Sequence, residues 1–472
     1  MSLLIQGGRV LTFNSDKSIS FPRKDILIDR NRIAKVELDI KFDGPTIDAS
    51  NKIVSPGFID THRHLWQSHL RTSTANLSLL GYLGEMLLGR AIFYRPYDVY
   101  LAQVGAAAEA LHCGITTVLD HCHVQVSEEH IQKCIQATVE SGIRSVFCFA
   151  PMTLPISLNP IQMPDFNEAH SEQMDVFYKL AESESFGGKA NDGRVTLGLG
   201  YDGMQFRPLE DTRKAFSFAE QKGMTITMHD AEYHGMPALK FCRENNLTSN
   251  VMIFSHASYA TDADLKYARD AGAGISCTPE CEMQMGHGWP EAFRAKRLGC
   301  KVGLGVDSSA NCSGDMFYTM RIALQTQRAK DNATLADRGK IPLKLHALVD
   351  EAIYMATLGG AEAIHREKEI GSLEVGKLAD LILIDTDGPC MIGSLDLAAA
   401  MVMHATTADV GTVIVNGEIV KRDGVLQSVN WNELKKELAQ NRLELEEMYK
   451  HVDWERNIKD VAEMWHLMSK AE

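Results

Sequence analysis

The chain has 472 residues, of which 45% are hydrophobic and 23% charged, the balance of an ordinary soluble globular protein. Its net charge of −14 argues against nucleic acid or an anionic membrane as a partner, because both bind basic surfaces. The sequence predicts no signal peptide and no transmembrane helix. The ten cysteines are dispersed without a Cys-x-x-Cys pair, which favours reduced thiols in a cytoplasmic protein.

Both ends of the chain predict β-structure. Apolar, β-branched runs occupy residues 3–13, 25–36, 379–385 and 410–420. Because these runs enclose a long segment of a different pattern, we expect the two ends to meet in one small domain. The prediction is a β-sandwich composed of residues 1–55 and 366–430.

Residues 56–365 alternate between amphipathic helices and short apolar strands, the pattern of parallel strand–helix units. We expect helices at residues 98–112, 130–141, 209–223 and 262–271. At roughly 30–40 residues per unit, the segment has the length of an eight-stranded TIM barrel, an α/β fold. A charged helix is predicted at residues 432–450, within a C-terminal helical tail of residues 431–472.

Several predicted barrel strands end in residues that can hold a metal ion. The run Ser55-Pro-Gly-Phe-Ile-Asp-Thr-His-Arg-His64 places His62 and His64 on one face of a strand end. His229, His256 and Asp307 each follow a short apolar run later in the chain. Their spacing assigns the five residues to strands 1, 5, 6 and 8, whose carboxyl ends converge on one site. The sequence therefore predicts a catalytic metal centre at the mouth of the barrel.

Each of these residues also fits an ordinary structural role. An isolated His229 or His256 is more often a histidine of the core, and Asp307 could cap a helix that starts at Ser308-Ser309. Glu232, an acidic residue three positions after His229, could likewise be a solvated carboxylate near a helix N-terminus. Considered together at these spacings, however, the residues favour the metal centre.

The sequence resembles the amidohydrolase superfamily, and in particular its cytosine deaminase, S-adenosylhomocysteine deaminase and triazine hydrolase branch. The resemblance is carried by these elements together: the Pro56–His64 run, His229 with Glu232 three residues later, His256, Asp307 and the segment 371–380. It implies that His62, His64, His229 and Asp307 hold one divalent metal, and these ligand types suit Zn²⁺ or Fe²⁺. Because strand 4 ends without a lysine, the carbamylated bridge of two-metal relatives has no source in this chain.

The same resemblance assigns roles in catalysis. The metal would lower the pKa of a bound water and so supply hydroxide, whose proton Asp307 accepts. His256 would orient the hydroxide and stabilise charge on a tetrahedral intermediate. Glu232 would carry a proton to the substrate ring nitrogen and to the leaving amine. The predicted reaction is hydrolytic deamination of a small aminated heterocycle such as a pyrimidine, purine, triazine or pterin-like ring.

Six side chains are candidates for contacts with the substrate. Trp66 and Gln67 follow the histidine pair and could bind a flat ring by stacking and hydrogen bonding, or could simply build the loop. The other candidates lie in loops after strands 2, 4 and 7, and are His123, Tyr201, Gln284 and His287. The loop after strand 4 reads Tyr201-Asp-Gly-Met204, where many relatives place a substrate-binding histidine. This difference argues against inferring an adenosine-type substrate from those relatives.

Two alternatives remain open from the sequence. The same hydroxide could cleave another bond, with opening of a ring or with an amide, alkylamine or halide as the leaving group. The second alternative is a protein of a different class, a non-catalytic barrel relative that acts in assembly. Such relatives usually lack metal ligands, whereas this chain has them. The resemblance also implies a homo-oligomer, a dimer or tetramer, with the helix at residues 432–450 as a candidate contact.

Overall fold

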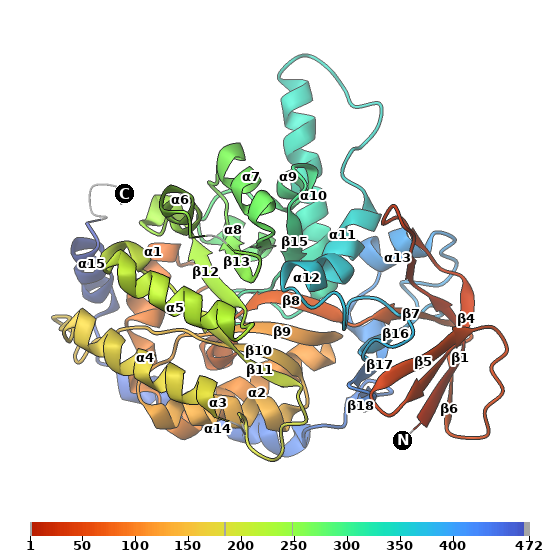
Figure 1. Cartoon of the computed structure of the whole chain (residues 1–472), viewed down its shortest axis with the longest axis horizontal. Helices are drawn as coiled ribbons and strands as arrows, with labels where there is room; N and C mark the ends of the chain where they lie inside the picture. Colours follow the sequence, from red (N-terminus) through yellow and green to blue (C-terminus); the bar gives the residue numbers. More distant parts are fainter. Residues whose placement is uncertain (1, 184–185, 248, 467–472) are drawn as a thin grey trace.

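The computed structural model describes residues 2–183, 186–247 and 249–466. Its larger part is a barrel of parallel strands that follow one another in sequence order, with helices around it (Figure 1). The barrel strands are β8 (Phe58–Arg63), β9 (Ile115–Cys122), β10 (Arg144–Phe149), β11 (Val195–Gly200), β12 (Ile226–Asp230), β13 (Met252–His256), β14 (Gly274–Cys277) and β15 (Lys301–Leu304). This arrangement confirms the predicted TIM barrel.

The first and last barrel strands close the barrel next to the predicted metal ligands. The Asp307 backbone N–H donates to the His62 carbonyl, and the His64 N–H donates to the Asp307 carbonyl, both over 2.8 Å. Glycines allow this close approach, because a Cβ on Gly303 would lie 2.3 Å from the Thr61 side chain. A Cβ on Gly305 would lie 2.9 Å from the His62 backbone. The ligands from the two strands are therefore joined through the backbone as well as through their side chains.

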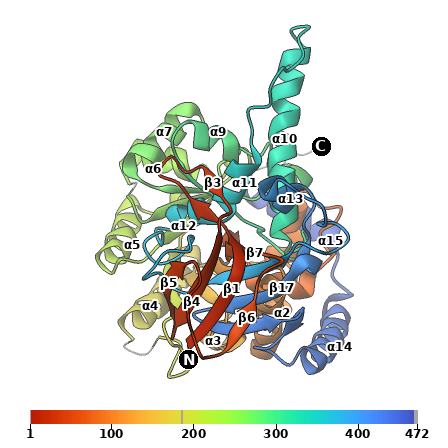
Figure 2. The same cartoon turned by 90° about the vertical axis from the view of Figure 1, so that its right-hand side faces the viewer.

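The helices of the barrel begin and end where local capping chemistry predicts. The outer helices are α2 (Pro96–His112), α3 (Glu128–Ser141), α4 (Phe166–Glu182), α5 (Leu209–Gln221), α6 (Ala238–Asn245), α7 (Asp262–Ala271), α8 (Pro279–Gln284), α9 (Ala292–Arg297), α10 (Met316–Ala336), α11 (Val349–Ala356) and α12 (Leu358–Ala363). Thr261 and Asp264 form a capping box at the start of α7, and Gly272 ends it with φ +75°. The helix α10 projects from the body of the protein (Figures 1 and 2).

The two ends of the chain form a second sheet beside the barrel (Figure 2). Its strands are β1 (Ser2–Val10), β4 (Arg23–Asp29), β5 (Arg32–Glu37), β6 (Thr46–Asp48), β7 (Lys52–Pro56), β16 (Leu381–Asp385), β17 (Val410–Val415), β18 (Glu418–Arg422) and β19 (Val425–Leu426), while β2 (Thr12–Phe13) and β3 (Ile19–Ser20) form a separate hairpin. Antiparallel pairing of β7 with β16 joins the N-terminal strands to the C-terminal strands. Residues from both ends, including Ile26 and Leu383, share a core separate from that of the barrel. The exact domain boundaries at residues 55 and 366 stay a prediction.

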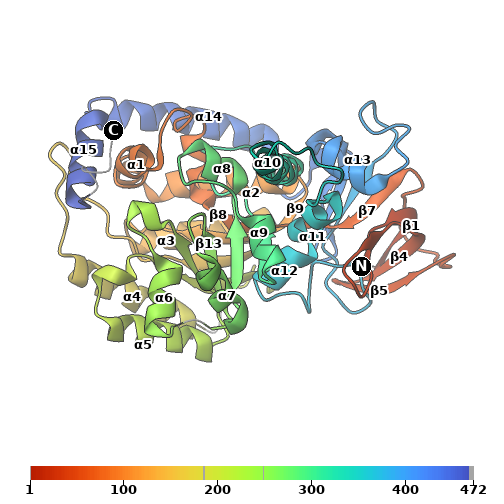
Figure 3. The same cartoon turned by 90° about the horizontal axis from the view of Figure 1, so that it is seen from above.

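The C-terminal tail consists of α14 (Trp431–Tyr449) and α15 (Trp454–Met464), which lie along one side of the barrel (Figure 3). The apolar stripe of α14 packs on the chain itself: Leu445 and Tyr449 are buried, and Leu438 lies against Gly105 of α2. Met448, near the end of the same helix, is 42% exposed. Among the described residues, no helix is long and apolar enough to cross a bilayer.

Candidate active site

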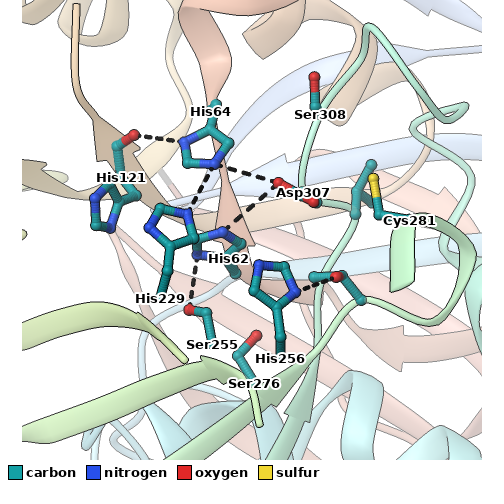
Figure 4. A network of polar contacts seen from close by, with 12 residues as sticks. His62, His64, His121, His229, Ser255, His256, Ser276, Cys281, Asp307 and Ser308 are labelled. Carbon is teal, nitrogen blue, oxygen red and sulfur yellow. Dashed lines mark hydrogen bonds and ion pairs between the residues drawn. The ribbon is translucent and has the colours of Figure 1, made fainter. Parts of the chain in front are cut away.

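His62 and His64 present the same ring nitrogen to the mouth of the barrel. His64 Nδ1 lies 2.7 Å from the backbone oxygen of His121. Because a carbonyl oxygen only accepts, Nδ1 carries the proton and Nε2 keeps a free lone pair. His62 Nδ1 lies 2.8 Å from Ser255 Oγ, whereas its buried Nε2 has no hydrogen-bond partner within the described part of the chain. Both Nε2 atoms point toward Asp307 (Figure 4).

Asp202 orients the third histidine, His229, near the end of β12. Its Oδ1 accepts from the backbone N–H of His229 over 2.8 Å, and its Oδ2 lies 2.9 Å from His229 Nδ1. The carboxylate therefore holds the proton on Nδ1 and leaves Nε2 free to bind an electrophile. Oδ2 also lies 3.0 Å from His121 Nε2. A second set of possible metal ligands consists of His121, Asp202 and His229. In this set the Asp202 carboxylate already binds the ring of His229.

Asp307 adds a carboxylate to the three histidines. Its Oδ1 lies 3.2 Å from His64 Nε2 and 3.6 Å from His62 Nε2. Asp307 lies three residues beyond the last barrel strand, and its φ of +71° is uncommon for a residue other than glycine. Burial raises the pKa of Asp307, but the neighbouring imidazoles of His64 and His256 outweigh it, so its pKa lies below the ordinary value.

These four residues fit a divalent metal ion. The donor atoms of His62, His64 and His229 lie within 4.8 Å of one another. The Nε2 atoms of His64 and His229 are 3.2 Å apart, and both rings carry their proton on Nδ1, so two lone pairs face each other. A cation shared by the two atoms relieves that repulsion. Imidazoles with one carboxylate are also the ligand set of catalytic zinc and iron sites.

His256 lies at the end of β13, beside the four candidate ligands. Its ring centroid is 5.2 Å from that of His62 and 4.6 Å from that of His287. Its Nδ1 lies 3.0 Å from Thr278 Oγ1, and Glu282 accepts the Thr278 backbone N–H over 2.7 Å. Burial lowers the pKa of His256 to about 3, so the ring is neutral at neutral pH. A neutral imidazole held in this way can donate one hydrogen bond toward the metal ligands.

The structure places Glu232 differently from the expectation. It starts the short 3-10 helix η5 (Glu232–His234) and forms an ion pair with Lys240 over 3.0 Å. Its side chain is 37% exposed and is not among the residues that line the cavity described next. Proton transfer by Glu232 therefore requires its side chain to turn away from Lys240, and its catalytic role stays a prediction.

A cavity of about 360 Å³ lies in front of these residues. His64, His229, His256 and Asp307 line one end of it. Of the six predicted substrate contacts, His123 and His287 also line the cavity. The His123 ring stacks on that of His64 with centroids 4.2 Å apart, which places it beside the metal ligands.

The other four predicted contacts lie outside the cavity lining and have other partners. Trp66 is fully buried and donates from Nε1 to His123 Nδ1 over 3.0 Å. Gln67 is fully buried, with its amide between the Tyr82 and Ser308 hydroxyls at 2.5 Å each. Tyr201 is buried and packs against Phe216, and Gln284 is exposed on the surface. We therefore do not include Trp66, Gln67, Tyr201 or Gln284 in the proposed substrate site.

The sequence reasoning missed three residues that position the histidines: Asp202, Ser255 and Thr278. Each contacts the Nδ1 atom of a different site histidine. Each lies at or just beyond the carboxyl end of a barrel strand, where side chains converge, and this location was the available signal. Their partners could not be read from the sequence, because each hydrogen bond joins residues of different strands.

Comparison with known proteins agrees with this geometry. The model of the amidohydrolase family matches residues 53–420. The chain is 27% identical over 444 residues to a 5-methylthioadenosine/S-adenosylhomocysteine deaminase of Thermoanaerobacter pseudethanolicus, which covers 91% of this chain and 96% of the relative. It is 27% identical over 438 residues to the protein of the same description from Pelotomaculum thermopropionicum, with 89% and 93% covered.

Two solved structures share the fold. Atrazine chlorohydrolase from Arthrobacter aurescens, complexed with zinc, has a TM-score of 0.78 and 23% identity, and the match covers 93% of this chain and 100% of that one. An adenosine deaminase from Xanthomonas campestris with bound zinc has a TM-score of 0.79 and 20% identity, with 94% and 98% covered. The family match spans the barrel together with strands β7 and β16 to β18 of the second sheet. From its barrel, its convergent histidines and this match, the chain belongs to the amidohydrolase family.

Proposed function

We propose that the protein is a metal-dependent aminohydrolase that removes an amino group from a small heterocycle as ammonia. The observation that carries this proposal is the convergence of His62, His64, His229 and the Asp307 carboxylate, three of which line one cavity. The deaminase names of the relatives support ammonia as the leaving group. The zinc in the two structural neighbours supports one Zn²⁺ per subunit, with Fe²⁺ as the other candidate.

Each of these residues has a separate role in the proposed reaction. His62, His64, His229 and Asp307 would hold the metal, which supplies Lewis acidity and makes a water molecule acidic near neutral pH. Asp307 would accept a proton from the attacking water, because its carboxylate is ionised and lies beside His64. His256, neutral and held by Thr278, donates a hydrogen bond to the oxygen that becomes negative in the transition state.

The leaving amine must also gain a proton. Glu232 serves this step in our proposal, after its side chain leaves Lys240 and turns into the cavity beside His229. Residue 232 lies two positions beyond β12, and His234, two residues later, lines the cavity. Hydrogen bonds of catalytic groups commonly tighten only when the substrate is bound.

The test is ammonia release by zinc-loaded protein across a panel of aminopyrimidines, aminopurines, aminotriazines and pterins. A ring that releases ammonia with wild-type protein but not with a metal-free sample supports the proposal and identifies the ring class. Silence across the whole panel, from protein that holds stoichiometric zinc, contradicts deamination. In that case the same samples are assayed for release of halide, alkylamine or carboxylate, which are the alternative leaving groups.

We further propose a homo-oligomer in a reducing compartment such as the cytoplasm. All ten cysteines are free, and Cys281 and Cys312 remain thiols with their sulfur atoms 3.5 Å apart. Two surfaces expose apolar side chains that a second copy could cover: Leu343 follows the projecting α10 and is 96% exposed, and Leu443 on α14 is 67% exposed. Analytical ultracentrifugation that shows only monomer at micromolar concentration contradicts this assembly.

A further inference from the structure

Most of the cavity lining away from the candidate ligands is apolar, although Thr153, Asn167 and Gln205 also contribute to it. The apolar wall comes from segments outside the barrel strands: the π-helix η2 (Leu83–Leu87) with Leu88, the loop after β10, and the C-terminal end of α15. Six side chains of these segments line the cavity: Leu83, Leu87, Leu88, Met163, Met464 and Trp465. The only hydrogen-bonding group among these six side chains is the indole N–H of Trp465.

The helix α15 is locked against η2, so Met464 and Trp465 have a defined place on this wall. The buried Asn457 side chain donates from Nδ2 to the Gly84 carbonyl over 2.5 Å and to the Leu88 carbonyl over 3.2 Å. These carbonyls are available because a π-helix leaves its hydrogen-bonding pattern irregular. A Cβ on Gly84 would lie 2.6 Å from Ile458 Cα, so the two backbones are in direct contact.

The same helix holds the loop that carries Met163. The Ile161 backbone N–H donates to Asp460 Oδ2 over 3.1 Å. The Asn159 side chain accepts from the Asp453 N–H over 2.8 Å and donates to the Asp453 carbonyl over 3.0 Å. One helix therefore sets the position of two parts of the apolar wall and supplies a third part itself.

We propose that α15 is the specificity element of the enzyme and that its wall binds an uncharged alkyl or aryl substituent on the substrate ring. This inference depends on the proposed function only for the placement of the ring at the metal end. A bare ring bound there would leave the apolar wall in contact with water, whereas a hydrocarbon substituent buries it. A ribosyl group would lose hydrogen bonds to water against these leucines and methionines without replacing them.

One feature of the cavity favours a competing substituent. Arg207, in the loop after β11, lines the cavity, donates to the Asp202 carbonyl and lies 5.6 Å from the centre of the Tyr201 ring. A carboxylate on the substrate could bind this guanidinium. Arg207 belongs to the loop that carries Asp202, however, and so to a different element from the wall of η2 and α15. An acidic substituent is therefore an alternative that the experiment has to exclude.

The test compares one ring with four substituents. Adenine, 9-butyladenine, 9-(3-carboxypropyl)adenine and adenosine are titrated into the zinc-loaded protein by calorimetry, and ammonia release is measured on the same samples. We expect 9-butyladenine to bind at least about 10-fold tighter than adenine, and tighter than the acidic and ribosyl compounds. We expect Trp465→Ala and Met464→Ala each to reduce this preference severalfold, with the affinity for adenine unchanged.

The matched control is Trp431→Ala, a half-exposed tryptophan of the same C-terminal tail outside the cavity, which should keep the wild-type preference. The proposal is overturned if 9-butyladenine binds no tighter than adenine, if the acidic or ribosyl compound binds best, or if Trp465→Ala leaves the preference intact. Because binding and ammonia release are separate readouts, a butyl preference without ammonia release would contradict the deaminase and leave the proposed apolar subsite standing. Ammonia release without a butyl preference would support the deaminase and contradict the proposed role of the apolar wall.

Discussion

The two ends of the substrate cavity are built in different ways. At the metal end, side chains from the ends of barrel strands are each held by a second polar residue, as Asp202 holds His229 and Ser255 contacts His62. At the apolar end, the wall comes from η2, a loop and α15, which are outside the barrel sheet and pack on one another. The chemistry is thus attached to the rigid sheet, and selection of the substrate is left to segments that can change without disturbing it.

Removal of a metal ligand is the strongest test of this division. We expect His62→Ala to lose stoichiometric zinc and with it all measurable turnover, because His62 is completely buried and its Nε2 has no other use in the described structure. Metal analysis of the purified variant measures the loss of zinc, and the ammonia assay measures the loss of turnover. His346→Ala, an exposed histidine, is the control and should keep both. Retention of one zinc by the His62 variant would remove His62 from the ligand set.

Glu232→Gln separates metal binding from proton transfer at the same end. We expect zinc to stay bound and kcat to fall by about 10²–10⁴, the usual contribution of a general acid or base. Lys240→Met is the matched control, since it frees Glu232 from its ion pair and should not lower kcat. Near-normal kcat in Glu232→Gln would mean that Glu232 stays at its exposed position during catalysis and that another group protonates the leaving amine.

Asp202→Asn tests whether the metal end depends on the residues behind its ligands. An amide cannot hold both the N–H and the ring of His229 as a carboxylate does, so we expect zinc affinity to fall about 10–100-fold. Competition with a chelator of known affinity measures this change. Asp211→Asn, near the start of α5 and outside the cavity lining, should bind zinc like the wild type. Equal zinc affinity in the two variants would show that Asp202 does not orient a ligand.

Gly84→Ala disturbs the apolar end alone. The new Cβ would lie 2.6 Å from Ile458 Cα and must push α15 away, at a cost of about 1–3 kcal/mol in the free energy of unfolding. We expect a lower Tm and a weaker butyl preference, with zinc still bound. Gly81→Ala is the control, because there the Cβ meets only the flexible Leu77 side chain, at 3.2 Å. Loss of zinc in Gly84→Ala would show that the two ends are coupled and contradict their separation.

The sequence predicted more about the metal end than about the apolar end. The assignment of His62, His229, His256 and Asp307 to strands 1, 5, 6 and 8 is confirmed, because a barrel strand has a recognisable apolar run and a polar end. The predicted helix at 262–271 coincides with α7, whose capping residues are local in sequence. Trp66 and Gln67 lie in a 3-10 helix, η1 (Leu65–Leu70), rather than in a loop. The direction of their side chains depends on His123 and Tyr82, which are distant in sequence or on other elements.

By itself the sequence determined the barrel, the composite sheet of the two chain ends and the set of candidate ligands. These follow from periodicity and from the order of residues along strands, which are properties of neighbouring positions. Only the tertiary structure decided that Asp202 holds His229, that Glu232 faces Lys240, and that Trp465 reaches the substrate cavity. Each of these depends on the packing of elements far apart in the chain, and packing at native density is set by the whole fold rather than by any local pattern.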